Sequence, residues 1–131
     1  MIEIPQTVID AIFRQAAEEL PDEACGLLAG VDGVVKKSFP LENTDHSPEH
    51  FSFDPREQFR VLKEARAEGL KIIANYHSHP STPARPSDED IRLAFDPHIA
   101  YLIASLAGAN PVIKAFAKTD DGMKEVEIKA V

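Results

Sequence analysis

The sequence is poor in cysteine, in long apolar runs and in positive charge, and each shortage excludes a class of protein. Its single cysteine, Cys25, cannot form an internal disulfide. The longest apolar run, "IAYLIA" at residues 99–104, is far shorter than the roughly 20 residues of a membrane-spanning helix. No secretory signal pattern opens the chain. We therefore expect a soluble protein of the reducing cytoplasm.

Charge and composition indicate which partners and how many domains to expect. The chain has 14 Lys and Arg against 22 Asp and Glu, a formal charge of -8, and so acidic a protein is poorly suited to a phosphate backbone. We expect no nucleic-acid partner. With 44% hydrophobic and 27% charged residues in a length of 131, the composition is that of a globular protein with one hydrophobic core. We therefore predict a single domain over residues 1–131.

Periodicity and composition predict three helices. Apolar side chains recur at helical spacing over residues 5–20. Residues 55–68 are rich in helix formers and place Phe59 and Leu62 on one side. A shorter helix is expected at residues 87–95, "SDEDIRLAF". These three segments are separated by strand-like sequence.

Two Asp-Gly dipeptides, at residues 32–33 and 121–122, favour tight hairpin turns. Residues 42–54 show no sustained period and are expected to form a surface loop. Strands are predicted at residues 24–30, 33–41, 70–79, 99–106, 112–119 and 124–131. The order of elements predicts an α/β fold in which helices flank a mixed sheet.

Two histidines near the end of the strand predicted at 70–79 form half of a candidate metal site. Side chains two residues apart on a strand point to the same face, so His77 and His79 can converge on one ion. Such a pair is more often structural, but Asp90 falls in the first turn of the next helix, where its carboxylate can turn back towards the strand end. Two nitrogens and one oxygen around an open position is how catalytic zinc is held, and the metal lowers the pKa of a bound water to about 7.

Ser87 and Glu23 are the candidate catalytic side chains. Ser87 precedes the helix and forms a capping-box pattern with Asp90, a structural role that is compatible with facing an oxyanion beside the metal. Attack of water on a carbonyl also needs a group that removes a proton and returns it to the leaving amine. Glu23, between the first helix and the first strand, is the candidate, although taken alone it reads as a solvated loop residue.

The order and spacing of these residues resemble the JAMM motif of the MPN-plus metalloproteases. A glutamate opens "EACGLL", then comes "HSHP", and seven residues separate its second histidine from the serine of "SDED". The resemblance covers nearly the whole chain and implies a single MPN domain with a cytidine-deaminase-like α/β fold. It also implies one zinc ion per chain bound by His77, His79 and Asp90. Glu23 would then act as general base and acid, and Ser87 would stabilise the tetrahedral intermediate.

The resemblance implies a zinc metallopeptidase or isopeptidase. Enzymes of this family cleave peptide or isopeptide bonds after the C-terminal Gly-Gly of ubiquitin-like proteins. Only 53 residues separate Glu23 from His77, and 41 follow Asp90, which leaves no room for the insertions of ubiquitin-specific members. The chain looks like the compact prokaryotic, Mec-like type, which releases cysteine from a sulfur-carrier protein. We therefore expect such a carrier as partner and a small amine as leaving group.

Other metal and thiol sites use similar residues. Two histidines and a carboxylate also bind Fe(II) in non-haem oxygenases, so the ligands alone do not choose the metal, but that triad normally follows the order H-x-D on a jelly roll. An amidohydrolase barrel needs about 250 residues. A zinc deaminase needs P-C-x-x-C, whereas Cys25 is the only cysteine and fits a core strand better than a nucleophile.

The alternative from another class is an MPN-fold scaffold with residual zinc and little activity. Such members generally lack a ligand or the glutamate, whereas all five positions are present in this chain. Metal content together with hydrolysis of a Gly-Gly adduct would separate the two functions. His46, His50 and His98 match no motif position and are interpreted as surface residues, the first two in the loop at 42–54 that can border the cleft.

Overall fold

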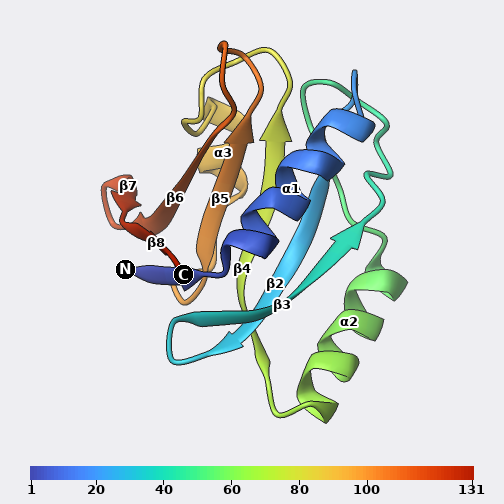
Figure 1. The fold of residues 1–131 in the computed structure, drawn as a ribbon, viewed down its shortest axis with the longest axis vertical. Coiled ribbons are helices and arrows are strands. Elements are labelled where there is room, and N and C mark those ends of the chain that lie inside the picture. The colour runs from blue at the N-terminus through green and yellow to red at the C-terminus, as the bar shows by residue number, and fades with distance from the viewer.

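The computed structural model describes residues 1–131 as one eight-stranded mixed sheet with three helices (Figure 1). The strand order is β7-β6-β5-β4-β2-β3-β1-β8. The helices are α1 (Gln6–Glu18), α2 (Pro55–Ala67) and α3 (Asp88–Leu93). The strands are β1 (Ile2–Ile4), β2 (Cys25–Val31), β3 (Val34–Leu41), β4 (Lys71–His79), β5 (Ala100–Ser105), β6 (Val112–Thr119), β7 (Gly122–Val126) and β8 (Ile128–Ala130). The predicted α/β class is confirmed.

Helix α1 covers one face of the sheet, as Figure 1 shows. Its buried side chains Ile9 and Ile12 belong to the larger core cluster, which also contains Leu28 of β2 and Tyr76 of β4. Side chains alternate between the faces of a strand, so the residues on either side of Leu28 in β2 point to the opposite face. This alternation separates the core under α1 from the core under α2.

Helix α2 packs on that second face through Val61 and Ala65, which lie one turn apart and join Leu27 and Phe39 in a smaller core cluster. The sequence had suggested Phe59 and Leu62 as neighbours on one side of this helix. They lie away from the contact and are 62% and 41% exposed. The buried face of α2 is therefore narrow, and it is formed by the small side chains of Val61 and Ala65 rather than by the bulkier Phe59 and Leu62.

The C-terminal strands differ from the expected hairpin. Strands β6 and β7 pair as predicted, with the turn at residues 120–121 and Gly122 already in the strand. After the single residue Glu127, however, β8 pairs in parallel with β1, a short strand that the sequence did not reveal. The two ends of the strand order are therefore joined by one residue of the chain, which requires the sheet to curl.

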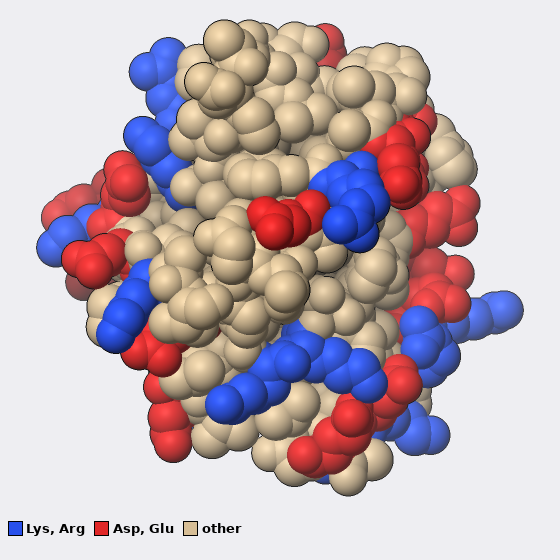
Figure 2. Space-filling model, in the orientation of Figure 1, with Lys and Arg blue, Asp and Glu red and all other residues tan.

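No helix of the structure is long and apolar enough to cross a membrane. On the face shown in Figure 2, Lys and Arg side chains form small separate groups among Asp and Glu. That face has no continuous basic patch of the kind that a nucleic-acid backbone requires.

Candidate active site

Strand β4 lies in the centre of the sheet, antiparallel to β2 and parallel to β5. Its register pairs His77 with Cys25, the first residue of β2. Beyond this pair, the Ser78 backbone N–H donates to the Ala24 carbonyl at 2.9 Å, and the Ala24 N–H donates to Ser78 Oγ at 2.7 Å. These bonds hold the segment that carries Glu23 against the end of β4.

His77, His79 and Asp90 form a compact cluster of possible metal ligands. Asp90 Oδ2 lies 3.2 Å from His77 Nε2 and 3.0 Å from His79 Nε2, and the two Nε2 atoms are 3.2 Å apart. In a tetrahedral zinc site with bonds of about 2.0–2.1 Å, neighbouring ligand atoms stand about 3.3 Å apart. The three ligand atoms therefore have the spacing of one triangular face of a zinc coordination tetrahedron.

The second nitrogen of each imidazole has a different environment. His79 Nδ1 lies 2.9 Å from the Pro83 carbonyl oxygen, which can only accept, so Nδ1 carries a proton and Nε2 is the nitrogen that can bind a metal. The His77 ring stacks on Phe51 with centroids 4.7 Å apart and an interplanar angle of 22°, and its Nδ1 is buried without a hydrogen-bond partner. One ligand is thus oriented by a hydrogen bond and the other by packing.

The charges in the cluster are coupled. Burial lowers the pKa of His77 and outweighs the opposing effect of Asp90. Burial acts to lower the pKa of His79 too, but the hydrogen bonds to Asp90 and Pro83 raise it overall. For Asp90, burial is outweighed by hydrogen bonds to the two histidines, which hold its pKa well below the usual range. The site therefore favours an ionised carboxylate, the form that binds a cation.

Asp90 is held in place by the start of α3. Ser87 is the N-cap, and its Oγ accepts a hydrogen bond from the Asp90 N–H at 3.1 Å. In return, Asp90 Oδ2 accepts from the Ser87 N–H at 3.0 Å. The predicted capping box is confirmed, and the same carboxylate oxygen faces both histidines. Ser87 is exposed, and its hydroxyl proton remains available.

Glu23 lies outside the three-residue cluster and is only 3% exposed. Its Oε1 has no hydrogen-bond partner, and burial, partly offset by the charge of His79, raises the pKa of its carboxyl to about 8. The Glu23 backbone is fixed by loop 42–54, because Asn43 Nδ2 donates to its carbonyl at 3.0 Å and its N–H donates to the Ser47 carbonyl at 2.8 Å. The structure presents a buried, unpaired carboxyl group whose main chain cannot move freely.

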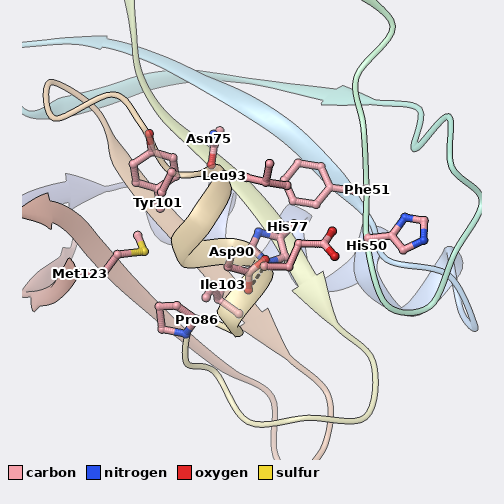
Figure 3. A pocket seen from close by; sticks show the side chains of 12 residues that line it. His50, Phe51, Asn75, His77, Pro86, Asp90, Leu93, Tyr101, Ile103 and Met123 are labelled. Carbon is pink, nitrogen blue, oxygen red and sulfur yellow. Dashed lines mark ion pairs between the residues drawn. The ribbon is translucent and has the colours of Figure 1, made fainter.

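A cleft runs along β4 between loop 42–54 and α3 (Figure 3). Phe51, His77 and Asp90 lie together in it, and Asn75 and Tyr101 line it further along. His50 also lines the cleft.

The other two histidines outside the motif lie apart from this cleft. His46 contacts Glu42 on the surface, 3.4 Å from its carboxylate. His98 is exposed at the opposite end of the sheet, in another surface depression. Of the loop histidines, only His50 therefore borders the cleft.

The structure brings the predicted ligands together and reveals three supporting residues that the sequence did not indicate. Ser78 secures the Glu23 segment, Phe51 stacks on His77, and Asn43 holds loop 42–54 through bonds to four main-chain groups of Glu23, Asp45, His50 and Ser52. Phe51 and Phe53 are the two phenylalanines of the loop, but nothing in the sequence shows which of them contacts His77. Asn43 and Ser78 had no signal either, because their roles depend on partners distant in sequence.

Comparison with known proteins supplies the family. The model of prokaryotic homologs of the JAB domain matches residues 5–118. The chain belongs to the prokaryotic JAB family. The resemblance to compact prokaryotic JAMM proteins that the motif indicated is thereby confirmed.

This JAB protein has curated relatives over most of its length. It is 34% identical over 100 residues to the CysO-cysteine peptidase of Mycobacterium tuberculosis, which covers 75% of this chain and 68% of that protein. It is 37% identical over 92 residues to a probable TtuB-protein conjugate cleaving protease of Thermus thermophilus, which covers 70% of this chain and 62% of that protein.

Solved structures confirm the architecture of this JAB protein. The solution structure of DSY2949 from Desulfitobacterium hafniense has a TM-score of 0.91 at 49% identity and covers 100% of this chain and 93% of that chain. AF2198, a JAB1/MPN domain protein from Archaeoglobus fulgidus, has a TM-score of 0.69 at 24% identity and covers 99% of this chain and 97% of that chain. The second likeness concerns the fold alone and agrees with the expected MPN architecture.

Proposed function

We propose that this JAB protein is a zinc-dependent peptidase or isopeptidase that cleaves after the C-terminal Gly-Gly of a ubiquitin-like or sulfur-carrier protein. One observation carries the proposal: three ligand atoms at tetrahedral spacing lie beside a buried carboxyl group that has no partner. The names of the mycobacterial and Thermus relatives, a CysO-cysteine peptidase and a protein-conjugate protease, support a protein conjugate as substrate.

His77, His79 and Asp90 would hold the zinc ion. When bound, zinc supplies Lewis acidity, which polarises a carbonyl oxygen and makes water a better nucleophile at neutral pH. Glu23 is the proton carrier: it accepts a proton from the attacking water and passes it to the nitrogen of the leaving amine. Its buried position suits both steps, because burial raises the pKa of the carboxyl, so the carboxylate is a stronger base towards the attacking water and the acid form keeps its proton near neutral pH until the amine takes it.

Ser87 would stabilise the oxyanion that develops on the scissile carbonyl. Its Oγ already accepts a hydrogen bond from the Asp90 N–H, so the hydroxyl proton can be donated outward to a substrate oxygen. The cap and the oxyanion contact therefore use different parts of the same hydroxyl group.

A small leaving amine fits the shape of the site. Strand β4 ends at His79, and the chain turns into the loop that leads to α3, whereas a cleft borders the ligands on the side of β4 that carries Asn75 and can take an extended peptide. We propose that this cleft receives the carrier's tail and that the amine, an amino acid such as cysteine, departs at the other end.

The test is hydrolysis of a carrier protein whose C-terminal Gly-Gly is joined by a peptide bond to cysteine, followed by mass spectrometry. The zinc-loaded protein should release the cysteine. Glu23→Gln should retain zinc and fold but lose about 10²- to 10⁴-fold in turnover, the usual contribution of a positioned acid and base. The matched variant Glu49→Gln, at an exposed carboxylate of the nearby loop, should keep the wild-type rate.

Failure to hydrolyse any Gly-Gly adduct with stoichiometric zinc bound would overturn the enzymatic proposal in favour of the scaffold alternative. Loss of zinc in Glu23→Gln would instead make Glu23 a ligand. Cleavage of linked ubiquitin chains alongside inert carrier-cysteine adducts would leave a hydrolase but contradict the small leaving amine.

A further inference from the structure

Asn75 is the polar residue of the cleft that the proposed chemistry does not use. It lies two residues before His77 on β4 and lines both the cleft beside the ligands and the more apolar groove that continues it between α2 and α3. In the register of the sheet it is flanked by Leu27 on β2 and Tyr101 on β5. The side chain is half-buried on the cleft face of the sheet.

The carboxamide of Asn75 lacks a partner. Its Oδ1 is buried without a hydrogen bond, and the neighbouring Tyr101 hydroxyl is already engaged, since it donates to the Asp96 carbonyl at 3.1 Å and accepts from the Asp96 N–H at 3.0 Å. A buried acceptor without a donor destabilises the folded protein, and most such groups in native structures are satisfied. An unpaired amide in an apolar cleft therefore indicates a ligand with backbone-like hydrogen-bonding groups.

The topology of the sheet explains why a peptide bound in the cleft would need hydrogen bonds from side chains. Strand β4 is central, and both of its edges are paired, with β2 and with β5. A peptide lying over β4 cannot join the sheet as a neighbouring strand and form a backbone ladder with it. Its amide groups can only be met by side chains that rise from the floor of the cleft, and Asn75 offers both a donor and an acceptor.

We infer that Asn75 binds the substrate by pairing its carboxamide with a backbone amide of the carrier's extended tail, on the acyl side of the scissile bond. The inference rests on the proposed function, in which the leaving amine is small and only the tail can fill the cleft. Asn75 and His77 are two residues apart on a strand, about 6.6 Å. An extended peptide advances at a similar rise, so the bonded amide belongs to the residue about two positions before the terminal glycine.

The experiment uses short peptides that end in Gly-Gly-cysteine and the isosteric variant Asn75→Leu in the zinc-loaded, full-length protein. Asn75→Leu should raise KM about three- to tenfold, the effect of one neutral hydrogen bond, with kcat and zinc content unchanged. The same variant should raise the melting temperature, because it removes the unsatisfied oxygen. A residue with a purely structural role would not combine higher stability with weaker substrate binding.

Replacing the relevant backbone amide of the peptide by an ester tests the contact itself. The ester should raise KM for the wild-type protein and have no further effect on Asn75→Leu. The control Gln58→Leu changes an exposed amide at the outer part of the same groove and should respond to the ester like wild type.

An unchanged KM for Asn75→Leu, or an equal ester effect in both proteins, would overturn the inference while leaving the proposed function intact. If the wild-type protein hydrolyses no adduct, the proposed function fails. The affinity of the product peptide, which ends in a Gly-Gly carboxylate, for wild type and Asn75→Leu in calorimetry then still decides the role of Asn75.

Discussion

Ser78, which lies between two proposed metal ligands, contacts the segment that carries Glu23. Its side chain points away from the face that carries His77 and His79 and meets the backbone of Ala24, whose N–H donates to Ser78 Oγ at 2.7 Å. Because Ala24 follows Glu23 directly, this bond and its backbone counterpart set the position of the glutamate relative to the ligands.

We expect Ser78→Ala to lower kcat without changing zinc affinity or KM. The variant leaves the Ala24 N–H buried and unpaired, which should cost about 1–3 kcal/mol of unfolding free energy and loosen the Glu23 segment. Urea denaturation, zinc titration and steady-state kinetics on the folded protein provide the three readouts. Ser78→Thr should restore kcat, and Ser81→Ala, at an exposed loop position, is the control. A normal kcat in folded Ser78→Ala would show that Glu23 is positioned without this bond.

Metal content should distinguish variants of the three proposed ligand residues from variants of neighbouring residues. His77→Ala and Asp90→Ala each leave two protein ligands, too few for a tight zinc site, so elemental analysis after dialysis should find little metal. His50→Ala removes an imidazole that lines the cleft but lies outside the cluster, and it should retain about one zinc per chain. Stoichiometric zinc in both ligand variants would contradict the assignment.

At the level of single residues, the sequence predicted what a local motif can encode. His77, His79, Asp90 and Ser87 lie close together in the chain, and strand and helix periodicity suffice to bring them together. Asn43 and Ser78 act on groups 20 and 54 residues away, so their roles appear only once the sheet register is known. The unpaired state of Asn75 depends in the same way on its neighbours in space.

In helix α3, the residues that stabilise the first turn are the same residues that are proposed to act in the site. The helix has only six residues and no buried side chain, so the capping box at Ser87 and Asp90 is the main interaction that fixes its first turn. The same box aims the Asp90 carboxylate at the histidines. The proposed oxyanion contact of Ser87 must therefore be tested without disturbing the cap.

Two substitutions of Ser87 separate these roles. Ser87→Ala should lose about 0.5–2 kcal/mol of unfolding free energy through the missing cap and should reduce kcat about 10²- to 10³-fold through the missing oxyanion donor. Ser87→Asp should restore the stability, because aspartate caps helices well, but not kcat, because a carboxylate cannot donate a hydrogen bond. Recovery of kcat along with stability in Ser87→Asp would show that Ser87 is only a cap.

Whole elements were predictable where the local sequence carried a clear pattern. The sequence indicated all three helices and six of the strands, because each carries a period, a capping pattern or a turn signal. It did not indicate β1 or the separation of β7 from β8. Both terminal strands have only three residues, and their pairing depends on tertiary contacts rather than on local sequence. Ile2 and Ile4 are 5% and 0% exposed, and burying them favours the parallel β1–β8 pair over a longer hairpin.

At the scale of the molecule, β8 ties the C-terminus to the N-terminal strand. Main-chain bonds join Ile2 to Glu127 and Val131 to Ile4, each at 3.0 Å. Deleting residues 128–131 should lower the unfolding free energy by on the order of 1–3 kcal/mol, since it uncovers apolar area on β1. Urea denaturation measures the loss, and Lys129→Ala, which removes only an exposed side chain, is the control. A truncated protein as stable as the full chain would mean that β8 contributes no net stability.

The curled sheet also limits how copies of this protein can interact. An open sheet offers unpaired N–H and C=O groups along its outermost strands, and these groups can recruit strands from other molecules. Here the outermost strands are β7 and β8, which are only five and three residues long and are joined to each other by the single residue Glu127. A crowded solution of the folded protein should consequently be slow to seed fibrils, because such short outer strands offer few groups to which another strand can pair.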